Sequence, residues 1–231
     1  THEGYYGLPA ITHCCLEPHG QVVHWNGDEI ILYASTQAVT RIGADLAKNL
    51  SADPEIGHVS PNQIHVITQH MGGGFGSKFS IDAWGVACAK LSKKTGRPVK
   101  LMLDRDQELM IAGGRPSDYG KVKVGAKKDG TVVAYESETW STSGIRSRGT
   151  PPLPYVIEAP NRRTRHLNVS TNTGLARAWR APNHAQAAVL TMCPLTDLAA
   201  KLNMDPLDFF KKNVELTARA DVYRTELDKA A

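Results

Sequence analysis

The ten residues Gln69-His70-Met71-Gly72-Gly73-Gly74-Phe75-Gly76-Ser77-Lys78 join a predicted strand to a predicted helix. The strand is indicated by the alternating apolar residues of 63–68, and the helix by the apolar pattern of 81–91. Four glycines within five residues leave backbone N–H groups uncovered by side chains. Because a helix N-terminus adds partial positive charge, the stretch suits an anion or a flat ligand approached closely by backbone.

Two common glycine signatures do not fit this stretch. A Walker A motif requires Gly-Lys-Ser/Thr, whereas Ser77 separates Gly76 from Lys78 here. The dinucleotide fingerprint G-x-G-x-x-G fits only with a mismatch at its last glycine. From the loop alone, a glycine-rich turn without a ligand is the alternative to a binding loop.

Composition indicates an ordinary globular chain. The sequence has 231 residues, of which 41% are hydrophobic and 22% charged, and a formal net charge of +4. The short basic clusters at 121–123, 127–128 and 162–165 are interpreted as solvated hairpin faces rather than a nucleic-acid site. No nucleic-acid partner is predicted.

The cysteines and the termini leave the compartment open between cytoplasm and periplasm. Cys14, Cys15, Cys88 and Cys193 include no C-x-x-C pair, so neither a zinc ribbon nor a disulfide framework is indicated. No apolar run approaches the roughly 18 residues of a membrane helix, and the first residues do not make a signal peptide. The polar start without an initiator methionine suggests a chain cut from something longer.

Residues 11–20 are dense in groups that can ligate metals. In a strand, His13, Cys15 and Glu17 would share a face, which makes a zinc site one interpretation. Such a site needs a fourth ligand, and Pro18 ends the strand pattern just before His19. Pocket-lining or packing roles are therefore favoured, and no metal-binding residue is predicted.

A second strand–helix junction singles out Gln37. The continuous apolar run of 29–34 predicts a buried strand, and Ser35-Thr36 is expected to cap a helix over 37–49. Gln37 would then expose its amide at the carboxyl end of a strand, where α/β proteins commonly place ligands. The alternative is a first-turn helix residue that faces water.

The remaining pattern predicts an α+β fold with mixed sheets flanked by helices. The further expected elements are a strand at 97–103, a helical turn at 104–110, an antiparallel hairpin of 119–127 and 131–140 turning at Asp129-Gly130, a strand at 164–171, a helix at 184–202 and a last helix capped by Asp205. We treat 1–231 as one region of a larger subunit, with 1–115 and 116–231 as candidate sub-regions.

Taken together, these segments resemble the molybdenum hydroxylases, the xanthine dehydrogenase and aldehyde oxidase family. The loop at 72–78 is similar to the family's G-G-G-F-G-G-K, Ser35-Thr36-Gln37 to its S-T-Q, and residues 171–180 to its T-N-x-x-x-x-A-F-R. Residues 202–208 resemble its L-G-M-D-P-L-E. Residues 11–20 and 180–182 are most similar to bacterial aldehyde oxidoreductases.

The resemblance implies a cofactor and the residues that contact it. The cofactor is a molybdenum-pyranopterin, in bacteria often its cytosine dinucleotide form. Gln37 would hydrogen-bond the oxo group of the metal and is the one candidate catalytic residue in this chain. The remaining residues that the resemblance places around the cofactor and the substrate are Gly73, Gly74, Phe75, Gly76 and Arg180 for the cofactor, and Trp179 and Arg148 for the substrate pocket, with Arg146 as the pocket arginine if the alignment slips by two residues.

Two departures from the family pattern shape the predicted function. Xanthine-oxidising relatives carry a glutamate directly after the loop lysine, whereas this chain has Phe79, so aldehydes are favoured over purines, with N-heterocycles as further candidates. The family's catalytic glutamate lies in a later domain, and its iron–sulfur clusters and FAD lie on partner chains or domains. We therefore expect this chain alone to be inactive. The rival hypotheses are a xanthine dehydrogenase and a non-catalytic assembly domain that lacks the cofactor.

Overall fold

The computed structural model describes residues 1–145 and 149–230, and it divides into two compact units. Unit 1 comprises Thr1–Ile11, Arg115–Ala176 and Ala181–Ala231, and unit 2 comprises Thr12–Gly114 and Arg177–Arg180. Each unit is thus discontinuous in sequence. The glycine loop, Gln37 and Trp179 all belong to unit 2.

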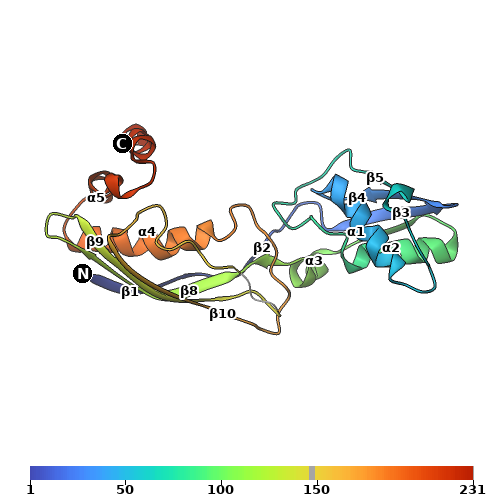
Figure 1. Cartoon of the computed structure of the whole chain (residues 1–231), viewed down its shortest axis with the longest axis horizontal. Helices are drawn as coiled ribbons and strands as arrows, with labels where there is room; N and C mark the ends of the chain where they lie inside the picture. The colour runs from blue at the N-terminus through green and yellow to red at the C-terminus, as the bar shows by residue number, and fades with distance from the viewer. Residues whose placement is uncertain (146–148, 231) are drawn as a thin grey trace. The chain divides into compact units, whose positions relative to one another are not determined.

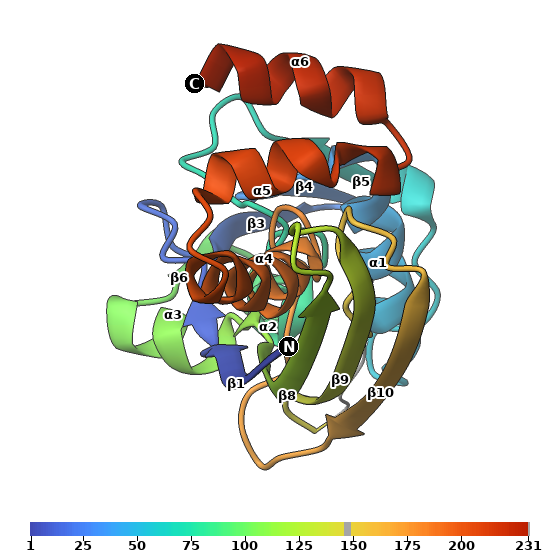
Figure 2. The same cartoon turned by 90° about the vertical axis from the view of Figure 1, so that its left-hand side faces the viewer.

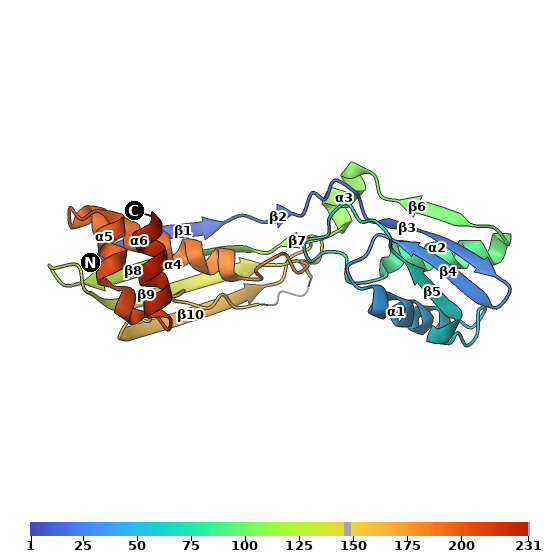
Figure 3. The same ribbon diagram turned by 90° about the horizontal axis from the view of Figure 1, so that it is seen from above.

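Unit 2 is a four-stranded mixed sheet with two helices on one face. The strand order is β5 (Ile64–Ile67), β4 (Glu29–Ala34), β3 (Gly20–Asn26), β6 (Val99–Met102), as Figure 3 shows. β4 and β5 are parallel, and the other pairs are antiparallel. Helices α1 (Val39–Ser51) and α2 (Asp82–Thr95) cover the same face (Figure 1).

Strand alternation explains why the helices of unit 2 pack where they do. In β4, the side chains of Ile30, Leu32 and Ala34 are buried, and Tyr33 between them is half exposed. The buried set joins Ile42, Leu46 and Leu50, which recur along one side of α1, in one apolar core. The two strand–helix junctions therefore emerge at one edge of the sheet, after β4 and after β5.

The expected start of the first helix is wrong by two residues. We expected Ser35-Thr36 to cap a helix from residue 37, but α1 begins at Val39 and its N-cap position, Ala38, makes no side-chain cap. The reason is that Thr36 Oγ1 and Gln37 N both donate to the carbonyl of Lys78, at 3.0 and 2.8 Å. The backbone at Gln37 is held by the glycine loop, so the helix starts after it.

Unit 1 is a four-stranded sheet backed by a long helix. The strand order is β1 (His2–Leu8), β8 (Ser117–Ala126), β9 (Val132–Thr142), β10 (Asn161–Val169). The predicted antiparallel hairpin is confirmed as β8 and β9, with Gly130 at φ +89° in its turn. β10 runs parallel to β9 and ends at Val169 rather than residue 171.

The helices of unit 1 follow its last strand in the chain. Helix α4 (His184–Lys201) packs on β1 and β8, with α5 (Pro206–Lys212) and α6 (Ala220–Ala230) beyond it (Figure 2). The predicted Asp205 cap is confirmed, since its carboxylate accepts from the N–H groups of Leu207 and Asp208. The short elements are β2 (Ile11–Thr12), η1 (Pro61–Gln63), α3 (Arg105–Ile111), β7 (Gly114–Arg115) and η2 (Val214–Leu216). No helix in the described residues is long and apolar enough to cross a membrane.

Candidate functional site

The glycine loop requires its glycines. Gly73 and Gly76 have φ of +102° and +111°, and Phe75 between them is at +50°. A Cβ on Gly74 would lie 2.5 Å from Gln37 Oε1, and one on Gly76 would lie 2.4 Å from the Ala178 carbonyl oxygen. Any larger residue at either place would displace Gln37 or the segment at 177–180.

Gln37 is oriented by this loop. Its Oε1 accepts from the backbone N–H of Gly76 at 2.8 Å and of Lys78 at 3.4 Å. Because the amide oxygen of Gln37 faces these two N–H groups, the Nε2 group of the same amide points away from them. Among the described residues no hydrogen bond uses Nε2, nor the backbone N–H of Gly74 or Phe75. The arrangement offers donors to a ligand that carries oxygen acceptors.

Residues Arg177–Arg180 are fastened to the loop from the other side. Arg180 N donates to Phe75 O at 2.7 Å, and Arg177 Nη1 donates to Ser77 O at 2.8 Å. Arg177 also forms a two-pronged ion pair with Asp82 at 2.9 and 2.5 Å. These bonds bring Trp179 beside the loop, although about a hundred residues separate the two segments in sequence.

Lys78 anchors the end of the loop in the interior. It is 1% exposed, and its Nζ donates to Glu17 O at 2.7 Å and to Ser35 Oγ at 2.6 Å. The Glu17 carboxylate lies 3.9 Å from Nζ and also accepts from Gly72 N, at the start of the loop. Burial lowers the pKa of Lys78, and the charge of Glu17 opposes that shift.

A buried histidine–carboxylate pair that no sequence pattern predicted supports the same turn. Glu108 accepts from the backbone N–H of His19 and bonds its Nδ1, both at 2.8 Å, and both residues are at most 3% exposed. His19 Nε2 lies 3.3 Å from Ser77 O, the carbonyl that Arg177 also reaches. Because Glu108 lies 89 residues from His19, no local pattern could have paired them.

The dense run at 11–20 is not gathered into a metal site. His13 bonds the Ala178 carbonyl, Glu17 bonds the glycine loop and His19 bonds Glu108. No group of three or more His, Cys, Asp or Glu in the described part of the chain could hold a metal ion. The run instead forms hydrogen bonds to the glycine loop and to the segment at 177–180.

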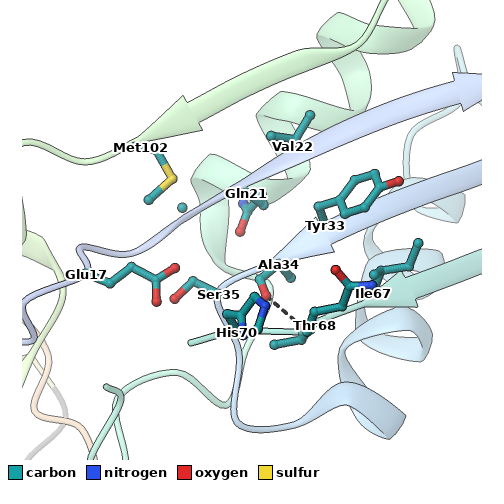
Figure 4. A pocket seen from close by; sticks show the side chains of 12 residues that line it. Glu17, Gln21, Val22, Tyr33, Ala34, Ser35, Ile67, Thr68, His70 and Met102 are labelled. Atoms are coloured by element: carbon teal, nitrogen blue, oxygen red, sulfur yellow. Dashed lines mark hydrogen bonds between the residues drawn. The ribbon is translucent and has the colours of Figure 1, made fainter. Parts of the chain in front are cut away.

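A cavity of about 270 Å³ adjoins the start of the loop. In Figure 4, Val22, Tyr33, Ile67 and Met102 form its apolar wall, while Glu17, Ser35 and His70 line the side toward the loop. Neither Gln37 nor Trp179 lines it. Since ligand pockets usually enclose about 300–1,000 Å³, we assign no ligand to this cavity.

The structure describes two of the three expected substrate-pocket residues, Phe79 and Trp179. Phe79, directly after the anchored Lys78, is 41% exposed. Arg148 and its alternative Arg146 lie outside the described residues. Trp179 is half-buried and stacks on His13.

A family of known proteins matches nearly the whole chain. The model of the molybdopterin cofactor-binding domain matches residues 1–214. The chain belongs to that family. Its members named below are molybdenum oxidoreductases, so the resemblance recognised from the sequence is confirmed.

Members of the molybdopterin-binding family with assigned names match most of the chain. The aldehyde oxidoreductase molybdenum-binding subunit PaoC of Escherichia coli K12 is 28% identical over 88% of this chain and 27% of its own. The xanthine dehydrogenase/oxidase of Gallus gallus is 31% identical over 92% of this chain and 16% of its own. The chain thus spans about a quarter or less of either relative.

Solved structures confirm the predicted α+β fold class. The aldehyde oxidoreductase of Desulfovibrio gigas matches with a TM-score of 0.73 and 28% identity, over 91% of this chain and 23% of that one. The quinoline 2-oxidoreductase of Pseudomonas putida 86 matches with a TM-score of 0.78 at 20% identity, over 91% of this chain and 28% of that one, and shows the fold alone.

Proposed function

We propose that this chain is the first molybdenum-cofactor-binding region of a hydroxylase subunit that oxidises aldehydes. One observation carries the proposal. The backbone N–H of Gly76 donates to the Oε1 of Gln37, and among the described residues Nε2 of this amide and the backbone N–H groups of Gly74 and Phe75 make no hydrogen bond. In a molybdopterin-binding family, donors so directed fit the oxygen-rich metal end of the cofactor.

The fit extends to the approach of the backbone. The close contacts of Gly74 with Gln37 and of Gly76 with the Ala178 carbonyl leave no room for side chains, so the loop backbone packs directly against both of these segments of the proposed site. We assign cofactor contact to Gln37, to Gly73 through Gly76, and to Arg180, whose backbone N–H is fixed on Phe75 O. The cytosine dinucleotide form belongs to this proposal.

The residues of this chain bind and orient, and the cofactor supplies the redox chemistry. When bound, molybdenum supplies a two-electron oxidation in which water is the source of the added oxygen. Gln37 would act electrostatically, because the hydrogen bond from the loop to its Oε1 holds the amide in place before any ligand binds. The proton-accepting glutamate belongs to a later segment of the subunit, and iron–sulfur and flavin partners would receive the electrons.

The preference for aldehydes rests on Phe79 and Trp179. Neither side chain offers the acid or the paired hydrogen-bonding edge that a purine would require, and Phe79 has 41% of its surface free to pack on a ring or alkyl group. A site that lacks a partner for a substrate's polar groups discriminates against that substrate strongly. Arg148, or Arg146, completes the proposed pocket.

The test compares kcat/KM for benzaldehyde and xanthine in the assembled enzyme that contains this chain, with molybdenum content measured in parallel. We expect benzaldehyde to be preferred by at least tenfold, and Phe79→Glu to reduce that preference. Comparable values in the parent enzyme would refute the aldehyde assignment. Absence of molybdenum would refute the cofactor role and favour an assembly domain.

A further inference from the structure

His13, in the run at 11–20, contacts the segment carrying Trp179. Its Nε2 lies 2.7 Å from the Ala178 carbonyl oxygen, and its ring stacks on the Trp179 indole with centroids 4.7 Å apart and planes 24° apart. It is 7% exposed. One buried side chain therefore holds both the backbone and the ring of neighbouring residues.

The hydrogen bond also fixes the protonation pattern of the His13 ring. A carbonyl oxygen only accepts, so Nε2 carries the hydrogen. Burial lowers the pKa of His13, with the charges of His19 and Arg177 adding to that shift against the carbonyls of Ala178 and Gly113. The ring is consequently neutral near pH 7. Its Nδ1 is buried and makes no hydrogen bond to any described residue.

The Ala178 carbonyl that His13 holds also faces the glycine loop. A Cβ on Gly76 would meet this oxygen at 2.4 Å, so the carbonyl lies directly against the loop backbone. Arg180 N is bonded to Phe75 O on the far side of Trp179. The backbone is thus fixed before and after Trp179, and the stack with His13 fixes the ring between those points.

We propose that His13 is a positioning residue that sets the orientation of the Trp179 ring and thereby the selectivity of the site for aromatic substrates. The proposal deepens the proposed function and rests on it, because Trp179 is taken as a wall of the substrate pocket. His13 acts through Trp179, whose ring keeps part of its surface exposed for a ligand.

Two variants separate the ring from the donor. His13→Gln keeps an amide donor near the Nε2 position and loses the ring, while His13→Phe keeps a stacking ring and loses the donor. In the assembled enzyme we expect His13→Gln to lower the ratio of kcat/KM for benzaldehyde to that for acetaldehyde by roughly 2- to 12-fold, the range of one aromatic pair. We expect His13→Phe to keep the ratio within about twofold, although both rates fall because the Ala178 carbonyl loses its donor.

A second measurement needs neither cofactor nor substrate. The sequence has four tryptophans, so subtracting the emission of a Trp179→Phe chain isolates that of Trp179. An imidazolium quenches an indole stacked on it. We therefore expect the Trp179 emission of the 231-residue chain to fall on acidification with a midpoint below about pH 6.5. His13→Phe and His13→Gln should both abolish this titration.

The fluorescence titration tests the contact between His13 and Trp179, and the ratio of kcat/KM values tests the role of His13 in selectivity. An acid titration of Trp179 that persists in His13→Phe would overturn the stacking contact, whatever the enzyme oxidises. Equal substrate ratios in His13→Gln and the parent enzyme would overturn the selectivity role. An assembled enzyme that oxidises no aldehyde would refute the proposed function, while the fluorescence titration would still decide whether His13 orients Trp179.

Discussion

Asp118 should make the stability of unit 1 depend on pH in a direction opposite to that of most carboxylates. Its side chain in β8 is 2% exposed, and Oδ1 has no hydrogen-bond partner among the described residues. Burial raises the pKa of Asp118 from 3.8 to about 7, against a smaller opposing effect of the Tyr119 N–H. Burial raises the pKa of Tyr135, and the charge of Asp118 adds a smaller effect in the same direction.

The sign and size follow from proton linkage. The folded state holds the proton more tightly than the unfolded state, so the contribution of Asp118 is fully present below pH 3.8 and is lost as pH rises toward about 7. With 1.36 kcal/mol per pKa unit, the penalty grows by about 2.5 kcal/mol between pH 5 and pH 8. That change is a large fraction of the stability of a small domain.

The assay is urea unfolding of the 231-residue chain at several pH values between 5 and 8, followed by circular dichroism. Asp118→Asn cannot ionise, so its unfolding free energy relative to the parent should rise by about 2.5 kcal/mol across that range. Asp221→Asn is the matched control, because the Asp221 side chain is 99% exposed and should leave the pH profile unchanged. An Asp118→Asn difference that is the same at pH 5 and pH 8 would refute a buried, proton-binding Asp118.

Two further predictions concern the loop. Gln37→Ala should lower kcat of the assembled enzyme by about 10- to 1,000-fold, as loss of an oriented donor does, while its unfolding free energy falls by only about 0.5–1.5 kcal/mol, the cost of the lost bond to the loop; full turnover with full metal content would make Gln37 a surface amide. Gly76→Ala should destabilise the chain by at least about 1 kcal/mol more than Gly27→Ala. Both glycines have positive φ, but a Cβ on Gly76 would lie 2.4 Å from the Ala178 carbonyl oxygen, whereas nothing lies within 4 Å of a Cβ on Gly27. Equal urea midpoints for the two glycine variants would show that the contact with Ala178 is absent.

Periodicity and turn chemistry predicted the local elements well. The hairpin at Asp129-Gly130 and the cap at Asp205 depend on residues close in sequence, and both are as expected. The start of α1 was misplaced because the bonds that settle it come from the Lys78 carbonyl, 42 residues after Thr36. A local cap signal cannot register a competing acceptor so far along the chain.

The candidate site likewise has residues that the sequence predicted and residues that it did not. Glycine spacing and the resemblance to a known family singled out Gln37, the loop and Trp179, and the structure brings all three together in unit 2. Of the supporting residues, His13 was named in the sequence only as a possible ligand or a pocket-lining or packing residue, and Arg177 and Glu108 were not singled out, because each acts on a partner more than 80 residues away. The residues that hold the site in place were therefore harder to predict from the sequence than the residues of the site itself.

This asymmetry has a physical origin in the loop. A run of glycines has little conformational preference of its own and loses more entropy on folding than any other sequence of that length. Its single conformation must therefore be imposed from outside, by buried charge at Lys78, by carbonyl bonds at Ser77 and by the amide of Gln37. Because these contacts come from segments spread between residues 13 and 180, the loop can be rigid only in the folded unit. Rigid donors at a developing charge are what electrostatic catalysis requires, so the distant residues matter to the proposed chemistry although none of them needs to touch the ligand.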